Sequence, residues 1–237
     1  MTKKDLHYEP HSNMAGSKLN WLRASVLGAN DGIVSIAGLV VGVAGATNSI
    51  TVIFTAGMAG IIAGAISMAA GEFVSVSSQR DSERALLAKE LYELHTFPKE
   101  EFDELTSIYV KKGLSKETAH KVAKELSEKD AYAAHIDAEL NLDPDNLTNP
   151  WHAAIASAAS FLVGALIPLL AIIVPPASTR VPITFISVVF ALMITGSLSA
   201  KIGGANILRA SVRVVLGGVT AMVVTYLIGT ILGVKGV

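Results

Sequence analysis

Apolar residues fill five long stretches of the chain, and polar residues gather in one segment between the second and third of them. The five stretches cover residues 22–46, 50–77, 152–174, 181–200 and 211–234. A bilayer core about 30 Å thick needs about 20 apolar residues in a helix to span it. Because lipid offers no partner to backbone N–H and C=O groups, these stretches must be helical. The pattern predicts an all-α integral membrane protein with five transmembrane helices.

The polar segment is expected to form a three-helix insert between the second and third spans. Residues 80–148 hold 26 of the chain's 39 charged residues. The second apolar stretch continues into this segment without a helix breaker, so its helix should extend beyond the bilayer. We expect this extended helix to end at Leu94. The next helix should begin with Thr96 as its cap and Pro98 in its first turn, and end at Gly113. The last should begin with Ser115 as its cap and end at Leu142.

Composition excludes several classes of protein. Hydrophobic residues make up 51% of the chain and charged residues 16%, with a mean hydropathy of +0.50. About a quarter of residues are charged in a soluble domain. The chain has no cysteine, which excludes disulfides, thiolate metal sites and iron–sulfur clusters. A net charge of −1 without a basic stripe argues against a nucleic-acid partner. No cleavable signal peptide is expected.

The distribution of basic residues predicts the orientation in the membrane. Lysine and arginine occur before the first span and after the fourth, whereas the turn at 45–50 has none. We therefore expect the N-terminus and the insert to be cytoplasmic and the C-terminus to lie outside. Glycines four residues apart should let helices pack closely in lipid, within the bundle or between subunits of a homodimer. These pairs are Gly28 with Gly32, Gly38 with Gly42, Gly60 with Gly64, and Gly229 with Gly233.

Two acidic residues lie within the apolar stretches. Asp31 is in the first and Glu72 is near the end of the second. A carboxylate in a membrane costs at least about 2.5 kcal/mol, so such residues often mark ion or proton pathways. Met68 lies one helical turn before Glu72, and a thioether beside a carboxylate suits a borderline divalent metal such as Fe²⁺. A helix-packing role for Asp31, a solvated position for Glu72 and simple packing for Met68 are the alternatives.

The insert contains a second set of candidate metal ligands. Glu90 and Glu93, and likewise Glu101 and Glu104, are three residues apart and share one helix face. The turn before Pro98 could bring the two pairs together. Like charges repel at short range unless a cation lies among them, so this spacing suggests a divalent-metal site. An ordinary solvated acidic face is the alternative.

A third pair of residues in the insert could complete the same site. His135 and Glu139 lie four residues apart on the expected third helix. They could add a nitrogen ligand and a fifth carboxylate to the four glutamates.

Two motifs in the first two spans resemble the vacuolar iron transporter family. They are Leu27-Gly28-Ala29-Asn30-Asp31-Gly32-Ile33-Val34-Ser35 and Ala63-Gly64-Ala65-Ile66-Ser67-Met68. The resemblance covers nearly the whole chain. It implies a homodimeric, proton-coupled exporter of Fe²⁺, and often of Mn²⁺, with a cytoplasmic metal-binding domain.

The resemblance also implies roles for individual residues. Asp31 and Met68 fall on the family's membrane aspartate and methionine, which are implicated in carrying the metal. The insert matches the family's glutamates at Glu90, Glu93, Glu101, Glu104 and Glu139. The implied domains are an N-terminal cytoplasmic arm at 1–20, transmembrane helices at 21–77, a cytoplasmic metal-binding domain at 78–148 and transmembrane helices at 149–237.

This chain departs from the plant-type members of that family at two places. Gly60 stands where they carry a membrane glutamate, so the membrane site has fewer ligands. Glu72 is too far along the helix to replace it, since twelve residues span about 18 Å. His135 and Ile136 stand where the plant type has two methionines. Imidazole still suits Fe²⁺ but is less soft than sulfur, so Mn²⁺ or Zn²⁺ can substitute at the cytoplasmic site.

These observations predict a metal/proton antiporter of the cell membrane, not an enzyme, with no tightly bound cofactor. Its transported ion is Fe²⁺, with Mn²⁺ as a second candidate, and a path would run through Asp31, Met68 and Glu72. A ferritin-like ferroxidase is the first alternative, although such sites use a Glu-x-x-His spacing that is absent here. A membrane metal sensor that binds without transporting is the second.

Overall fold

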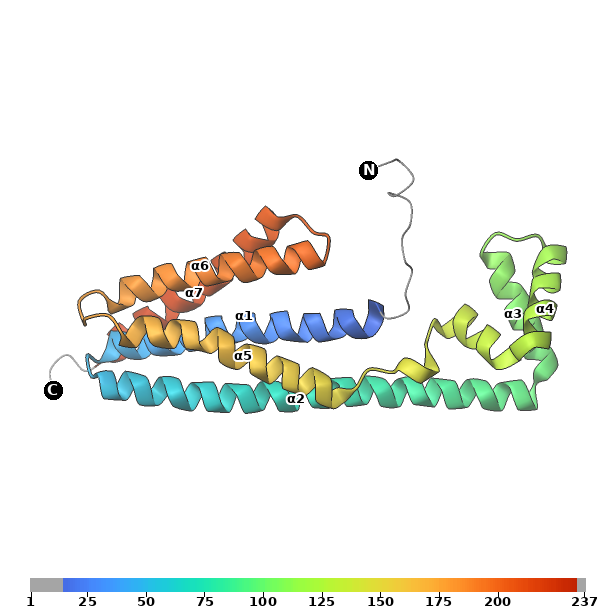
Figure 1. Cartoon of the computed structure of the whole chain (residues 1–237), viewed down its shortest axis with the longest axis horizontal. Helices are drawn as coiled ribbons and strands as arrows, with labels where there is room; N and C mark the ends of the chain where they lie inside the picture. The colour runs from blue at the N-terminus through green and yellow to red at the C-terminus, as the bar shows by residue number, and fades with distance from the viewer. Residues whose placement is uncertain (1–14, 234–237) are drawn as a thin grey trace, which may run out of the picture. The chain divides into compact units, whose positions relative to one another are not determined.

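The computed structural model describes residues 15–233 of the chain (Figure 1). Most of the expected N-terminal arm at 1–20 therefore lies outside the described residues. Within this range there are helices and no strands. Five helices are long and apolar enough to cross a membrane, which confirms an all-α, multi-pass membrane protein. They are α1 (Ala15–Ala46), α2 (Ile50–Thr96), α5 (Pro150–Ile173), α6 (Arg180–Ile202) and α7 (Ile207–Leu232).

The chain divides into two compact units. Among the described residues, 18–74 and 150–233 form the first, here called the membrane unit, and 75–149 belong to the second, here called the insert unit. Helix α2 contributes to both. Its 47 residues extend over about 70 Å, more than twice the thickness of a bilayer core. The expectation that the second helix continues beyond its apolar stretch is confirmed.

Small residues let the helices of the membrane unit approach closely. A Cβ on Gly28 would collide with the backbone of Ser157, and one on Gly32 with the backbone of Phe161, so α1 lies directly against α5. Gly229 of α7 faces the backbone of Gly42 of α1 in the same way. In lipid, where no hydrophobic effect drives helices together, such close backbone contact is a main source of association. The predicted packing role of these glycines is confirmed.

The insert unit contains two further α-helices and two short helical turns. Helix α3 (Pro98–Lys111) is followed by α4 (Lys116–His135), the π-helical turn η1 (Ile136–Leu140) and the 3-10 turn η2 (Pro144–Asn146). Ser115 caps α4 as predicted, its side chain accepting a hydrogen bond from the backbone N–H of Thr118. Gly113 follows α3 with a φ of 103°, which confirms it as the C-terminal glycine. These caps fix the turn that returns α4 alongside α3.

Two predicted helix boundaries in the insert are wrong. Thr96 does not cap α3, because it is the last residue of α2 and its hydroxyl donates to the carbonyl of Tyr92; Phe97 takes the cap position. The last helix is not continuous to Leu142, because Asp130 has extended backbone angles (φ −164°, ψ 98°) inside α4. Its side chain accepts a hydrogen bond from the N–H of Ala133 and so restarts the helix. Asn141, in the left-handed conformation, ends η1.

Candidate metal centre

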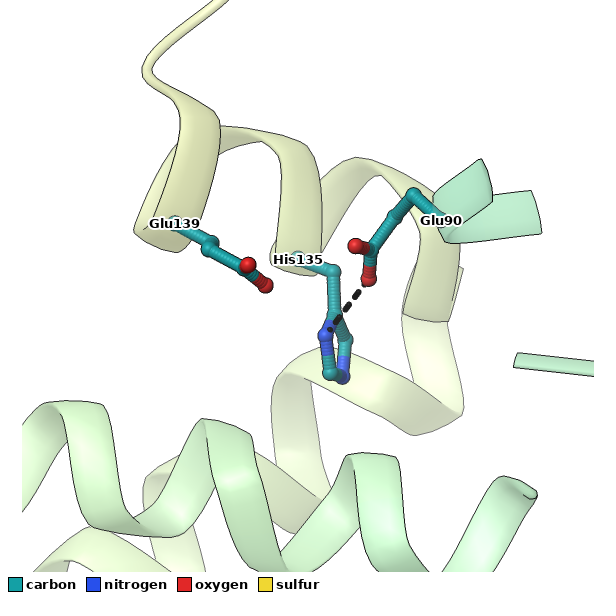
Figure 2. A group of neighbouring side chains, drawn as sticks. All are labelled: Glu90, His135 and Glu139. Carbon is teal, nitrogen blue, oxygen red and sulfur yellow. Dashed lines mark ion pairs between the residues drawn. The ribbon is translucent and has the colours of Figure 1, made fainter. Parts of the chain in front are cut away.

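Three potential metal ligands converge in the insert unit. Glu90 comes from α2, His135 is the last residue of α4, and Glu139 lies in η1. Each offers one ligand atom, and these atoms all lie within 4.8 Å of one another. Figure 2 shows the two carboxylates directed toward the imidazole ring from opposite sides. Residues far apart in sequence therefore form one oxygen- and nitrogen-rich group, here called the Glu90–His135–Glu139 cluster.

A fourth residue borders this cluster. Oε2 of Glu101, on α3, lies 3.6 Å from Nδ1 of His135, which is itself 2.9 Å from Oε1 of Glu90. Three of these side chains are buried, with exposed fractions of 1% for His135, 3% for Glu90 and 6% for Glu101. One member of each predicted glutamate pair, Glu90 or Glu101, therefore lies in this buried group.

His135 and Glu90 approach closely without forming a hydrogen bond. Nδ1 of His135 and Oε1 of Glu90 are both buried, and neither has a hydrogen-bond partner among the described residues despite their 2.9 Å approach. The atoms are close, but the direction required of an N–H donor is not met. Buried polar atoms without a partner are rare in folded proteins and call for an ion or water that satisfies them. The donor set, two carboxylates and an imidazole, fits a divalent cation such as Fe²⁺, Mn²⁺ or Zn²⁺.

The local backbone explains how His135 and Glu139 reach the cluster. The cap at Asp130 starts a new helical segment five residues before His135. The wider π-helical turn then follows, and such turns are often found at functional sites. Behind them Leu105, Ala123 and Ala134 form a small buried core with Phe102 and Leu126. Ala134 of this core directly precedes His135, so the core anchors the end of α4 that carries the imidazole.

Burial and mutual repulsion perturb the carboxyl groups of the cluster. Burial, together with the charges of Glu139 and Glu101, raises the pKa of Glu90 to about 7. Burial and the neighbouring Glu104 likewise raise the pKa of Glu101, and the same two causes raise that of Glu139. Because these carboxyl groups repel one another, binding a positive charge stabilises the group. A proton and a metal ion can both fill that role.

His135 is shifted in the opposite direction. Burial lowers its pKa despite the nearby acidic side chains, because a buried imidazolium loses its hydration. Since Glu90 is itself partly protonated near neutral pH, it offers the ring less negative charge than its 2.9 Å distance suggests. A neutral imidazole is the form that binds metals. The cluster therefore presents a ligand-competent histidine at neutral pH.

Two predicted ligands lie at the edge of the cluster. Glu93 is half-buried and pairs with Lys89 at 2.8 Å, and this hydrogen bond raises the pKa of Lys89. Glu104 is exposed on α3. Both add negative charge that raises the pKa of Glu90, and neither is a member of the Glu90–His135–Glu139 cluster. Both glutamates therefore influence the cluster electrostatically, and their role as direct ligands stays a prediction.

In the membrane unit, Asp31 lies on a partly open face of α1. Its Oδ1 accepts a 2.7 Å hydrogen bond from Oγ of Ser35, one turn further along the helix. Asp31 is half-buried, and Ser35 is exposed on this single chain. The neighbouring Asn30 points elsewhere, accepting a 2.5 Å hydrogen bond from Thr195 of α6. Asp31 and Asn30 therefore make separate hydrogen bonds, Asp31 within α1 and Asn30 to α6.

The other predicted membrane ligands have different surroundings. Glu72 is 8% exposed, and its Oε1 lies 3.3 Å from Nη2 of Arg23. It is therefore a buried, paired carboxylate rather than a solvated one. Met68 is half-buried and packs against the apolar core of the membrane unit. The position of Gly60 faces the side chains of Leu39 and Ile36 of α1, so apolar groups surround it.

Comparison with known proteins identifies the family. The model of the VIT family matches residues 22–230. The chain belongs to the VIT family. This VIT family member is 41% identical over 229 residues to a protein of Acanthamoeba castellanii named "Vacuolar iron transporter", with 93% of this chain and 82% of the relative covered. It is 33% identical over 236 residues to "Vacuolar iron transporter homolog 2" of Arabidopsis thaliana, covering 99% and 96%.

In this VIT family member the structure groups the predicted ligands unevenly. Glu90, Glu101, His135 and Glu139 come together, whereas Asp31 and Glu72 each have a separate polar partner. Sequence reasoning missed Arg23 as the partner of Glu72 and Asp130 as the cap that positions His135. An arginine at the start of an apolar stretch was a visible signal for the first. For the second, the signal was weak: aspartate is a common helix cap, but nothing else in the sequence marks Asp130 as one.

Proposed function

We propose that this protein exports a divalent metal ion, Fe²⁺ with Mn²⁺ as a second candidate, from the cytoplasm in exchange for protons. The observation that carries the proposal is the Glu90–His135–Glu139 cluster, with two buried ligand atoms that lack hydrogen-bond partners. The names of its relatives, which specify iron transport, favour Fe²⁺ as the substrate. The family match and five membrane-crossing helices agree with a transporter.

In this proposal residues 78–148 form a cytoplasmic domain that collects the ion. The cluster replaces part of the hydration shell of the metal with oxygen and nitrogen ligands, and Glu93 and Glu104 add attraction from nearby. The N-terminus is cytoplasmic and the C-terminus lies outside, as the lysine and arginine distribution predicts. Zn²⁺ can occupy the same ligands because they are neither purely hard nor purely soft.

The path through the membrane would then use Asp31, Met68 and Glu72. Asp31 lies on an exposed stripe of α1 formed with Leu27, Ser35 and Leu39, which repeats every four residues. A second copy of the chain packed on this stripe would enclose the carboxylate, and we propose such a homodimer with the path beside its twofold axis. Enclosure would remove Asp31 from lipid and leave metal or protons to neutralise it.

Competition for the same oxygens would couple the two fluxes. A carboxylate binds metal only when it is deprotonated, so binding a metal releases protons and binding protons releases metal. If the outer side is more acidic, protonation of Asp31 there would eject the ion. No separate proton relay is required. The direction of transport then follows from the pH gradient.

Flux measurements in proteoliposomes test this function. A vesicle interior more acidic than the outside should drive Fe²⁺ uptake. Comparison with Mn²⁺, Zn²⁺ and Ca²⁺ gives the selectivity. Glu101→Ala combined with Glu104→Ala should reduce uptake only at low metal concentration, as expected for a collecting site. Metal binding without flux in any gradient would contradict transport and favour a sensor, and oxygen consumption on Fe²⁺ addition would favour a ferroxidase.

A further inference from the structure

The ion pair between Arg23 and Glu72 joins the first two helices of the membrane unit. Nη2 of Arg23, on α1, lies 3.3 Å from Oε1 of Glu72, on α2, and the two residues are 49 positions apart in sequence. The two ends of the pair differ sharply in exposure. The Glu72 side chain is 8% exposed, whereas the Arg23 side chain is 58% exposed. One partner is fixed in the protein interior and the other remains accessible.

We propose that Arg23 is a built-in counter-cation that occupies Glu72 between transport events and that the transported metal displaces. This inference rests on the proposed function, since it assigns a regulatory partner to one carboxylate of the path. A buried carboxylate requires a positive partner, and Arg23 supplies it when no metal is present. A divalent ion supplies more charge at the same oxygen, so the two cations compete for Glu72.

The geometry of the pair suits exchange better than permanent pairing. Charged hydrogen bonds that lock two groups together are about 2.7–2.9 Å long, and this contact is longer. The Arg23 side chain is 58% exposed on this single chain, so the protein interior does not hold it in place as it holds Glu72. Arginine stays charged at any physiological pH. Competition from Arg23 therefore persists at every pH, unlike competition from a proton.

The surroundings give the released side chain a place to move. Arg23 also lines a cavity of about 340 Å³ between α1 and the end of α6, with Val26 and Asn30 on the α1 side and Ser199 and Gly203 on the other. The side chain can turn from Glu72 toward this cavity while its backbone stays in α1. Met68, one turn before Glu72 on α2, remains as a neighbouring soft donor for the arriving metal.

Transport kinetics provide the first test, using the full chain in proteoliposomes and Fe²⁺ under anaerobic conditions. Arg23→Gln should lower the KM by about two- to fivefold, the range that a half-exposed ion pair can contribute. Arg23→Lys, which keeps the charge, should stay close to the unmodified protein, and Arg209→Gln on α7 serves as a control for loss of an exposed arginine. In a Glu72→Gln background, Arg23→Gln should have no further effect on KM.

The outcomes separate this inference from the proposed function. An unchanged or raised KM in Arg23→Gln, or additive effects in the double variant, would overturn the counter-cation role while transport itself stands. Absence of metal uptake by the unmodified protein would instead overturn the proposed function.

Chemical modification provides a test that needs no variant and so does not depend on Arg23→Gln folding. Phenylglyoxal reacts with accessible arginines, and peptide mass spectrometry gives the rate at each site. Saturating Mn²⁺, which resists air oxidation, should increase the rate at Arg23 by about twofold or more relative to Arg209 and Arg213, as expected if the metal frees a half-exposed ion pair. A rate that Mn²⁺ leaves unchanged or lowers would show that Arg23 stays on Glu72 and would contradict displacement.

Discussion

Nδ1 of His135 and Oε1 of Glu90 lie 2.9 Å apart in the interior of the insert unit without a hydrogen bond between them. Two ligand atoms at this distance leave room for a shared cation after a small adjustment of either side chain. Because Glu139 reaches the same point, the group has the composition of a divalent-metal site. The predictions below test this site, the membrane path and the packing that supports them.

Loss of a central ligand should weaken metal binding strongly. We expect His135→Ala or Glu90→Gln to raise the dissociation constant for Mn²⁺ by at least about tenfold, since even a partner outside the ligand set can cost that much. Isothermal titration on the full chain in detergent measures the change. Glu125→Gln, which removes an exposed carboxylate from α4, is the matched control. Equal affinity in all variants would place the metal elsewhere.

Stability should depend on pH through Glu90. Its pKa is raised from the ordinary value of 4.5 to about 7, so the folded protein holds this proton more tightly than the unfolded chain does. This contribution to stability is complete below about pH 4.5 and is lost as pH rises through about 7. Thermal unfolding of the metal-free chain should show it, and Glu90→Gln should flatten the dependence.

Metal should reverse that trend. Deprotonation of Glu90 above about pH 7 makes its oxygens available, so Mn²⁺ should raise the melting temperature more at pH 8 than at pH 6. The same unfolding experiment with and without Mn²⁺ gives the comparison. A larger metal effect at the lower pH would contradict proton–metal competition at the cluster.

Asp31 should be required for flux and dispensable for collection of the metal. Asp31→Asn removes the charge but keeps the size of the side chain, so we expect loss of pH-driven Fe²⁺ uptake with unchanged Mn²⁺ affinity at the Glu90–His135–Glu139 cluster. Ser35→Ala removes only the hydroxyl that donates to Asp31 and should cause a smaller defect. Wild-type uptake by Asp31→Asn would exclude Asp31 from the path.

The two caps of α4 should differ in their effect on the metal site. Asp130→Ala and Ser115→Ala each remove a side-chain acceptor and should each cost about 1 kcal/mol of stability. Only Asp130 restarts the segment that carries His135 and Glu139, so only Asp130→Ala should also weaken Mn²⁺ binding. Parallel thermal unfolding and titration separate the two effects. Equal affinities would show that the kink does not position the ligands.

An added methyl group should disrupt helix packing in the membrane unit at Gly32 but not at Gly71. A Cβ at Gly32 would meet the backbone of Phe161, which cannot turn away as a flexible side chain can, so Gly32→Ala should cost about 1–3 kcal/mol. Gly71, also in a helix, has nothing within 4 Å of such a Cβ. Gly71→Ala should be neutral or stabilise by up to about 1 kcal/mol. Thermal unfolding in detergent measures both.

The sequence by itself determined the five membrane helices, most of their boundaries within a few residues, and the long continuation of α2, although α1 begins at Ala15, well before the expected start at residue 22. These features follow from hydrophobic length and from breakers such as Pro98 and Gly113, which act through the local chain. The spacing of Glu90, His135 and Glu139, the members of the cluster, and of Glu101 beside it is readable without coordinates.

Only the tertiary structure decided which of these residues meet and what partners they have. The kink at Asp130 and the π-helical turn set the direction of His135 and Glu139, and small energy differences between helical geometries are invisible in a periodic pattern. The pairing of Arg23 with Glu72 depends on how α1 packs against α2. Burial, which raises the pKa of Glu90, is likewise a property of packing, because desolvation arises from atoms contributed by distant parts of the chain.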